Sequence, residues 1–177
     1  MLQIAKGIEI SAEMIQKYST FLPDDIIEIW KEYGYGSLLG GYLRVINPEE
    51  YQELLRESYF RGNVSIPIFS TAFGDILTLE EGEYIGMIMY KYGDSRLITK
   101  KKRFIQNLED DCFVGKYFQI PLYTEAVSLI GELKPDECFG YVPLLGLGGK
   151  ETVENLSKVK MREHIELITQ LVGKIEM

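Results

Sequence analysis

Residues 66–90 read IPIFSTAFGDILTLEEGEYIGMIMY, and this stretch decides the fold. It contains three runs rich in β-branched, aromatic and long apolar residues, at 66–71, 75–79 and 84–90. Between the runs lie two short sequences typical of turns, Ala72-Phe73-Gly74 and Glu80-Glu81-Gly82-Glu83. The stretch therefore predicts three successive antiparallel strands joined by hairpins.

Helical patterns surround this predicted meander on both sides. Before it, we expect helices at 11–18, 23–33 and 48–58 and a strand at 42–46. After it, we expect a short strand at 97–99, helices at 103–113, 121–133 and 160–174, and an extended apolar segment at 139–147. The fold class is thus α+β, a mainly antiparallel sheet flanked by helices, with a helical C-terminal part packed on it.

The basic run Lys100-Lys101-Lys102-Arg103 marks a boundary between two parts of the chain. Residues 1–100 form the α+β part and residues 101–177 the mostly helical part. We expect the two parts to share one core, because the segment 139–147 is too apolar to remain exposed.

Charge and composition exclude several classes of protein. The chain has 177 residues, with 27 acidic and 19 basic side chains, and a net charge of −8. Residues 1–90 carry 14 of the acids and only 6 of the bases. Such a field repels phosphate backbones, so we expect no direct contact with nucleic acid. There is neither an apolar run of membrane-spanning length nor a signal-peptide pattern, which predicts a cytoplasmic protein without membrane contact.

No catalytic or metal site stands out among the reactive residues. The single histidine, His164, lies in a charged helical segment and is interpreted as a surface or capping residue. Cys112 and Cys138 fit no paired spacing and are expected to be reduced thiols. The cluster Glu109-Asp110-Asp111 leaves a carboxylate metal enzyme open as an alternative, although consecutive helical acids point in different directions. We therefore expect no enzyme activity, no cofactor and no metal.

Several separated motifs resemble those of the GAD-like domain and of the C-terminal domain that usually accompanies it. The motifs are LPDDI (22–26), WKEYGYG (30–36), GYL with VINPEEY (41–51), PIFSTAFGD (67–75), DECFGYVPLLGLGG (136–149) and ENLSKVKMREH (154–164). Such proteins are similar to bacterial type VI secretion immunity proteins, the class that neutralises a DNase effector. The resemblance implies a non-enzymatic inhibitor whose partner is a cognate toxin, with a basic nuclease among the toxins that fit.

An acidic inhibitor can be steered onto the basic, DNA-binding surface of a nuclease. We predict that the contact uses acidic loops in the first two-thirds of the chain, with the candidates Asp24, Asp25, Glu49, Glu50, Glu80, Glu81 and Glu83. A scaffold or regulatory protein-binding domain without a toxin partner is the alternative, because charge and tyrosine content fit it equally well.

Overall fold

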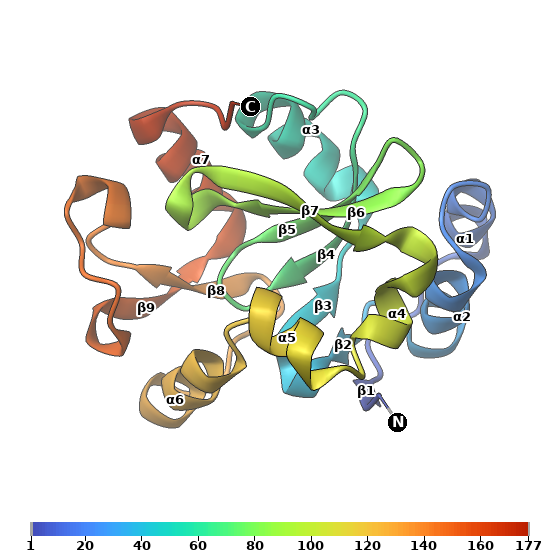
Figure 1. Cartoon of the computed structure of the whole chain (residues 1–177), viewed down its shortest axis with the longest axis horizontal. Coiled ribbons are helices and arrows are strands. Elements are labelled where there is room, and N and C mark those ends of the chain that lie inside the picture. The colour runs from blue at the N-terminus through green and yellow to red at the C-terminus, as the bar shows by residue number, and fades with distance from the viewer. Residues whose placement is uncertain (1, 177) are drawn as a thin grey trace.

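The computed structural model describes residues 2–176 and shows a meander sheet covered by helices (Figure 1). Within these residues, seven strands form one sheet in the order β1 to β7, and every neighbouring pair is antiparallel. The strands are β1 (Ile4–Ala5), β2 (Ser37–Leu38), β3 (Leu43–Val45), β4 (Ile66–Thr71), β5 (Ile76–Glu80), β6 (Tyr84–Met89) and β7 (Asp94–Lys100). A separate antiparallel pair consists of β8 (Glu137–Tyr141) and β9 (Leu156–Lys160).

Helices surround the sheet and confirm the α+β class (Figure 1). They are α1 (Ala12–Tyr18), α2 (Asp24–Tyr33), α3 (Pro48–Ser58), α4 (Phe104–Asn107), α5 (Asp111–Tyr117), α6 (Ile120–Ile130) and α7 (Met161–Val172). In the view of Figure 1, α1 and α2 lie to the right of the sheet, whereas α7, β8 and β9 lie to the left.

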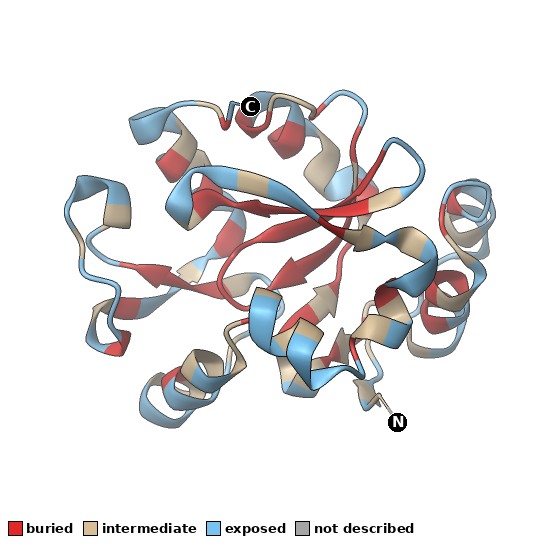
Figure 2. Ribbon diagram, in the orientation of Figure 1, coloured by how far each residue is buried: buried red, intermediate tan, exposed pale blue. Residues whose placement is uncertain are grey.

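The predicted central strands are confirmed, and a compact side-chain network closes the first hairpin. The Thr71 hydroxyl donates to Asp75 Oδ2 at 2.8 Å and accepts hydrogen bonds from the backbone N–H groups of Phe73 and Asp75. Gly74 follows with a φ of 75°, a conformation that favours glycine. All residues of β5 are buried (Figure 2), including the polar side chains of Thr78 and Glu80.

The expected helices of the first half form where their capping residues predict them. The Ser11 side chain accepts a hydrogen bond from Met14 N and begins α1. Asn47 caps α3 in the same way, with Pro48 at its first position. Gly34, with a φ of 62°, ends α2.

Two expectations about the second half were wrong. The single helix expected at 103–113 is divided into α4 and α5, because the Asp110 side chain accepts a hydrogen bond from Cys112 N and begins a new helix. The segment 139–147 is extended only as far as Tyr141, where β8 ends. Its pairing partner β9, and the short strands β1 and β2, were not predicted at all.

Residues on both sides of position 100 contribute to one hydrophobic core. Phe104 of α4 is fully buried and packs against Phe69 of β4, with ring centroids 5.4 Å apart. Phe139 of β8 packs against Phe73 at 6.1 Å and donates its backbone N–H to Ala72 O at 2.7 Å. Arg44 of β3 adds hydrogen bonds to backbone carbonyls just before and within β8. Residues 139–141 therefore pack against the first part of the chain, whereas Val142 and Leu147 of the same apolar segment are exposed, contrary to the expectation for 139–147 as a whole.

Candidate functional site

The acidic residues predicted to bind a partner lie on three elements. Asp24 and Asp25 occupy the first turn of α2, Glu49 and Glu50 the first turn of α3, and Glu81 and Glu83 the turn between β5 and β6. Carboxylates in a first helical turn interact favourably with the helix dipole, so four of these acids also have a local structural role. All three elements lie in the right half of Figure 1.

Nearby cations already neutralise several of these carboxylates. Lys17 Nζ lies 2.5 Å from Glu49, Arg61 lies 3.0 Å from Glu81, and Lys100 lies 3.5 Å from Glu83. Exposed pairs of this kind contribute little to stability and exchange readily with water or with another charged group. Burial is the largest influence on the Asp25 carboxyl, and it raises the pKa of this group.

Glu80 was predicted to lie in a turn and to contact a partner, but it is a buried residue of β5. Its side chain is only 1% exposed, at the end of β5. The carboxylate accepts hydrogen bonds from Arg61 Nε at 2.9 Å, Ser65 Oγ at 2.8 Å and Thr78 Oγ1 at 2.6 Å. Its three donors hold Glu80 inside the protein, so it is unavailable to a partner at the surface.

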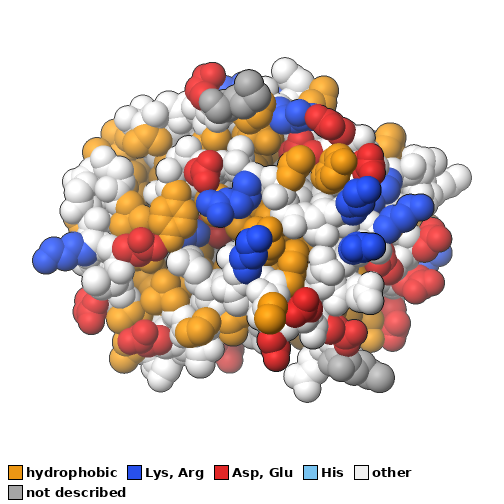
Figure 3. Space-filling model, viewed as in Figure 1, with side chains coloured by type: hydrophobic (Ala, Val, Ile, Leu, Met, Phe, Trp, Pro, Cys, Tyr) orange, Lys and Arg blue, Asp and Glu red, His pale blue; other side chains and the backbone are white. Residues whose placement is uncertain are grey.

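The face shown in Figure 3 carries charges of both signs. Lys and Arg side chains gather in the right half of this face, with acidic side chains among them (Figure 3). Apolar side chains gather in the left half of the same face (Figure 3). The excess of acid in the sequence therefore does not produce a uniformly acidic face in this view.

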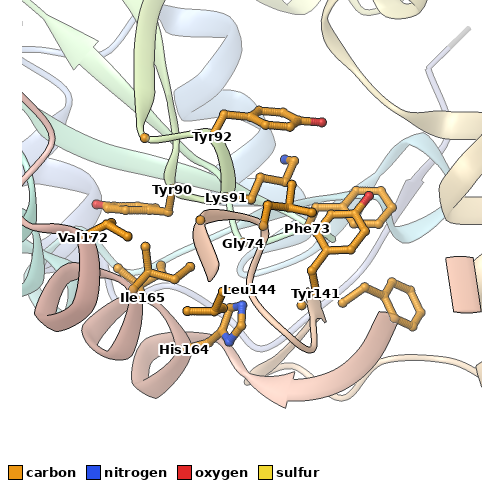
Figure 4. Close-up of a pocket in the computed structure, with 16 residues that line it drawn as sticks. Phe73, Gly74, Tyr90, Lys91, Tyr92, Tyr141, Leu144, His164, Ile165 and Val172 are labelled. Carbon is orange, nitrogen blue, oxygen red and sulfur yellow. The ribbon is translucent and has the colours of Figure 1, made fainter. Parts of the chain in front are cut away.

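An apolar cavity of about 350 Å³ is a second candidate site, and it does not involve the acidic elements. It lies between the turn after β4, the turn Tyr90–Tyr92 after β6, the end of β8 and one face of α7. Figure 4 shows rings and aliphatic side chains around it, including Phe73, Tyr90, Tyr141 and Ile165. Exposed apolar side chains also lie just after β8, at Val142 and Leu147, and at the end of α7, at Leu171 and Val172.

Lys91 lines the cavity and forms a buried ion pair with Asp75 behind it. Lys91 Nζ lies 2.5 Å from Asp75 Oδ1, and both side chains are less than a tenth exposed. The same ammonium lies 5.6 Å from the ring centroid of Phe73 and 5.0 Å from that of Tyr92, within the range of cation–π attraction. The positive charge is thus compensated by one carboxylate and two aromatic faces.

Burial shifts the pKa of two further side chains that line the cavity. Burial, with smaller effects of Glu151 and Asp75, raises the pKa of Tyr141 to about 12. Burial lowers the pKa of His164, whose ring lies so close to β8 that a Cβ at Gly140 would come within 2.5 Å of Nε2. In both side chains, the phenol of Tyr141 and the imidazole of His164, burial favours the uncharged form.

Two known protein families match successive parts of the chain. The family model of the GAD-like domain matches residues 2–90, and that of the T6SS immunity protein Tdi1, C-terminal, matches residues 99–172. The chain belongs to the GAD-like domain family. Among curated proteins, none matches its sequence.

A solved structure supports the fold of this GAD-like chain. The crystal structure of Atu4351 from Agrobacterium tumefaciens superimposes with a TM-score of 0.73 at 18% sequence identity. The match covers 93% of this chain and 82% of Atu4351. At this identity the similarity concerns the architecture alone.

The acidic cluster at 109–111 and the two cysteines were the other candidate residues of the GAD-like chain. Asp110 of the acidic cluster caps α5, and within residues 2–176 the acidic, histidine and cysteine side chains form no group of three placed to hold a metal ion. Cys112 is exposed and Cys138 buried, and both are free thiols. Across the same residues, every helix is too short or too polar to cross a bilayer.

Sequence reasoning missed the cavity because four separate segments build it. The aromatic run Tyr90-Lys91-Tyr92 and the stretch Phe139 to Tyr141 were the available signals. Their meeting beside α7 depends on the pairing of β8 with β9 and on the docking of both against the main sheet, which no local pattern indicates. His164 was interpreted as a surface or capping residue, but it is half-buried at the cavity wall.

Proposed function

We propose that this chain is a non-enzymatic immunity protein that binds a cognate type VI secretion nuclease effector and neutralises it. The observation that carries the proposal is the match of residues 99–172 to the T6SS immunity protein Tdi1 family. The GAD-like part at 2–90 accompanies it in one shared core, so the whole chain acts as the inhibitor.

The charge of the chain supports a basic partner. A net charge of −8 favours encounter with a nuclease whose DNA-binding surface is positive. Residues Asp24, Glu81 and Glu83 are exposed and face solvent on α2 and the β5–β6 turn. Ion pairs such as Arg61–Glu81 can exchange for contacts with a basic partner at small cost, because exposed pairs are weak.

Co-expression with a candidate nuclease effector from the same bacterium tests this function. We expect growth to be restored and plasmid DNA to remain intact when the chain is present. An unrelated nuclease effector, expressed at the same level, serves as the specificity control and should still kill. A catalytically inactive form of the cognate effector should co-purify with the chain, because neutralisation requires direct contact.

Unchanged killing by the candidate effector, with the chain folded and abundant, would exclude immunity against that effector. Recovery from the native bacterium of a stable complex with a non-toxic protein would instead favour a scaffold or regulatory role. The two results are distinguishable, because the second provides a partner whose expression alone does not harm cells.

A further inference from the structure

A different cavity, of about 200 Å³, lies between the main sheet and α5, and we call it the α5 cavity. Met87 and Met89 of β6 and Arg96 of β7 line its sheet side, and residues 115–119, at the end of α5 and just after it, line the opposite side. Arg96 lies directly opposite Met87 in the pairing of β6 with β7, so both side chains point to the same face of the sheet. The volume is below the roughly 300 Å³ of pockets for drug-sized ligands, so the α5 cavity suits a smaller group.

Positive side chains from three elements line the α5 cavity. Lys91 comes from the turn after β6, Arg96 from β7 and Lys116 from α5. Among the described residues of the wall, Asp75 is the only acid, and its Oδ1 lies 2.5 Å from Lys91 Nζ. Asp75 therefore compensates Lys91, and Arg96 and Lys116 remain as a local positive excess in a chain whose net charge is −8.

Neither Arg96 nor Lys116 has a strong partner within residues 2–176. Arg96 Nη2 lies 3.0 Å from Asp94 Oδ2, but both side chains of this pair are half-exposed, so the pair is weak. Lys116 Nζ lies 5.0 Å from the ring centroid of Tyr117 and forms no ion pair in the described part of the chain. Figure 3 shows basic side chains near the centre of the face on which β7 and α5 lie in Figure 1. Both cations are therefore available to an incoming anion.

We infer that the α5 cavity binds the phosphate group of a small molecule. A phosphate monoester carries about −1.5 to −2 charges at pH 7, which matches the two cations that Asp75 does not compensate. The planar guanidinium of Arg96 can donate two parallel hydrogen bonds to phosphate oxygens, and Lys116 adds a compact positive charge. A carboxylate, with one negative charge, would compensate only one of them. This inference is independent of the proposed immunity function, because neither the cavity nor its test involves the effector.

Three probes test the inference on the full-length chain by protein-observed NMR titration at constant ionic strength. They are inorganic phosphate, phenyl phosphate and benzoate, which has the same ring as phenyl phosphate but a single charge. We expect both phosphates to shift the amide resonances of residues 115–119 at millimolar concentration, and benzoate to bind at least about tenfold more weakly than phenyl phosphate. Equal affinity for the two phosphates would identify the free ion as the ligand, whereas tighter binding of phenyl phosphate would identify a monoester.

Two variants locate the phosphate, and a third is their matched control. Arg96→Gln and Lys116→Gln each remove one exposed cation of the wall and should weaken phosphate binding about tenfold, the value of one charge-assisted hydrogen bond. Lys102→Gln removes an exposed positive charge outside the wall and should change the affinity less than about twofold. All three positions are exposed, so we expect each variant to fold, which near-UV circular dichroism checks.

Three results would overturn the inference. One is the absence of any shift at residues 115–119 with either phosphate at millimolar concentration. Another is an equal affinity of the three folded variants, which would show that phosphate responds only to the net charge of the chain. The third is binding of benzoate as tight as that of phenyl phosphate, which would show that the α5 cavity does not select phosphate.

Discussion

Glu80 and Glu81 are neighbours in the sequence but lie in very different environments. Glu80 is buried and accepts three side-chain hydrogen bonds, whereas Glu81 is exposed in the turn. Arg61 contacts both, with Nε on Glu80 and a terminal nitrogen on Glu81. One arginine therefore connects the interior of the sheet to its surface at this hairpin.

Replacing each glutamate by glutamine measures this difference in environment. Glu80→Gln removes the charge that Arg61 compensates and places amide hydrogens against other donors. We expect it to lower the free energy of unfolding by about 3 kcal/mol. Glu81→Gln is the matched control and should change it by less than about 0.5 kcal/mol. Urea denaturation of the two variants compares them, and equal effects would contradict the burial of Glu80.

Elements whose ends are set by local residues could be predicted from the sequence. Ser11, Gly34 and Asn47-Pro48 fix the bounds of α1, α2 and α3 through caps and backbone conformation. The central hairpins follow from turn residues between apolar runs. The family resemblance likewise followed from motifs along the chain, and the GAD-like and Tdi1 C-terminal matches confirmed it.

Features that depend on distant partners could not be predicted. The burial of Glu80 requires Arg61 and Ser65 from the segment before β4, which only the fold brings near. Strand β9 has a short, mostly exposed sequence and forms because β8 offers it an edge. The cavity requires β8, β9 and α7 to come together. The sequence therefore shows its aromatic residues but not that they lie around one cavity.

The packing of α4 and β8 on the main sheet predicts that residues 1–100 do not fold alone. Cutting the chain after position 100 removes Phe104 and Phe139. The rings of Phe69 and Phe73, against which they pack, would then be exposed to water. We expect the full chain to unfold in a single transition and residues 1–100 to show no cooperative transition. Heating monitored by near-UV circular dichroism tests this. A sharp transition in the fragment would instead show that the first part is an independent domain.

At the scale of the whole molecule, charge and apolar surface belong to different elements. The acidic turns lie on α2, α3 and the β5–β6 hairpin, whereas the cavity lies between the sheet, β8 and α7. Long-range steering depends mainly on exposed charges, and the strength of a complex depends more on buried contacts. The exposed acids of these elements should therefore affect how fast an effector binds more than how long it stays.

Charge reversal of three exposed acids tests this division with the effector identified by co-expression. The triple variant Asp24→Lys, Glu81→Lys and Glu83→Lys changes exposed residues only and avoids buried Glu80. The control variant Glu132→Lys, Glu154→Lys and Glu163→Lys makes the same change in net charge on α7 and on loops beside β8 and β9.

We expect the first variant to associate about tenfold more slowly at low salt than the control, with similar dissociation rates. The difference should shrink in 0.5 M salt, where screening shortens the reach of exposed charges. Equal association rates in stopped-flow experiments would show that only the net charge matters, and would remove these acidic elements from the interface.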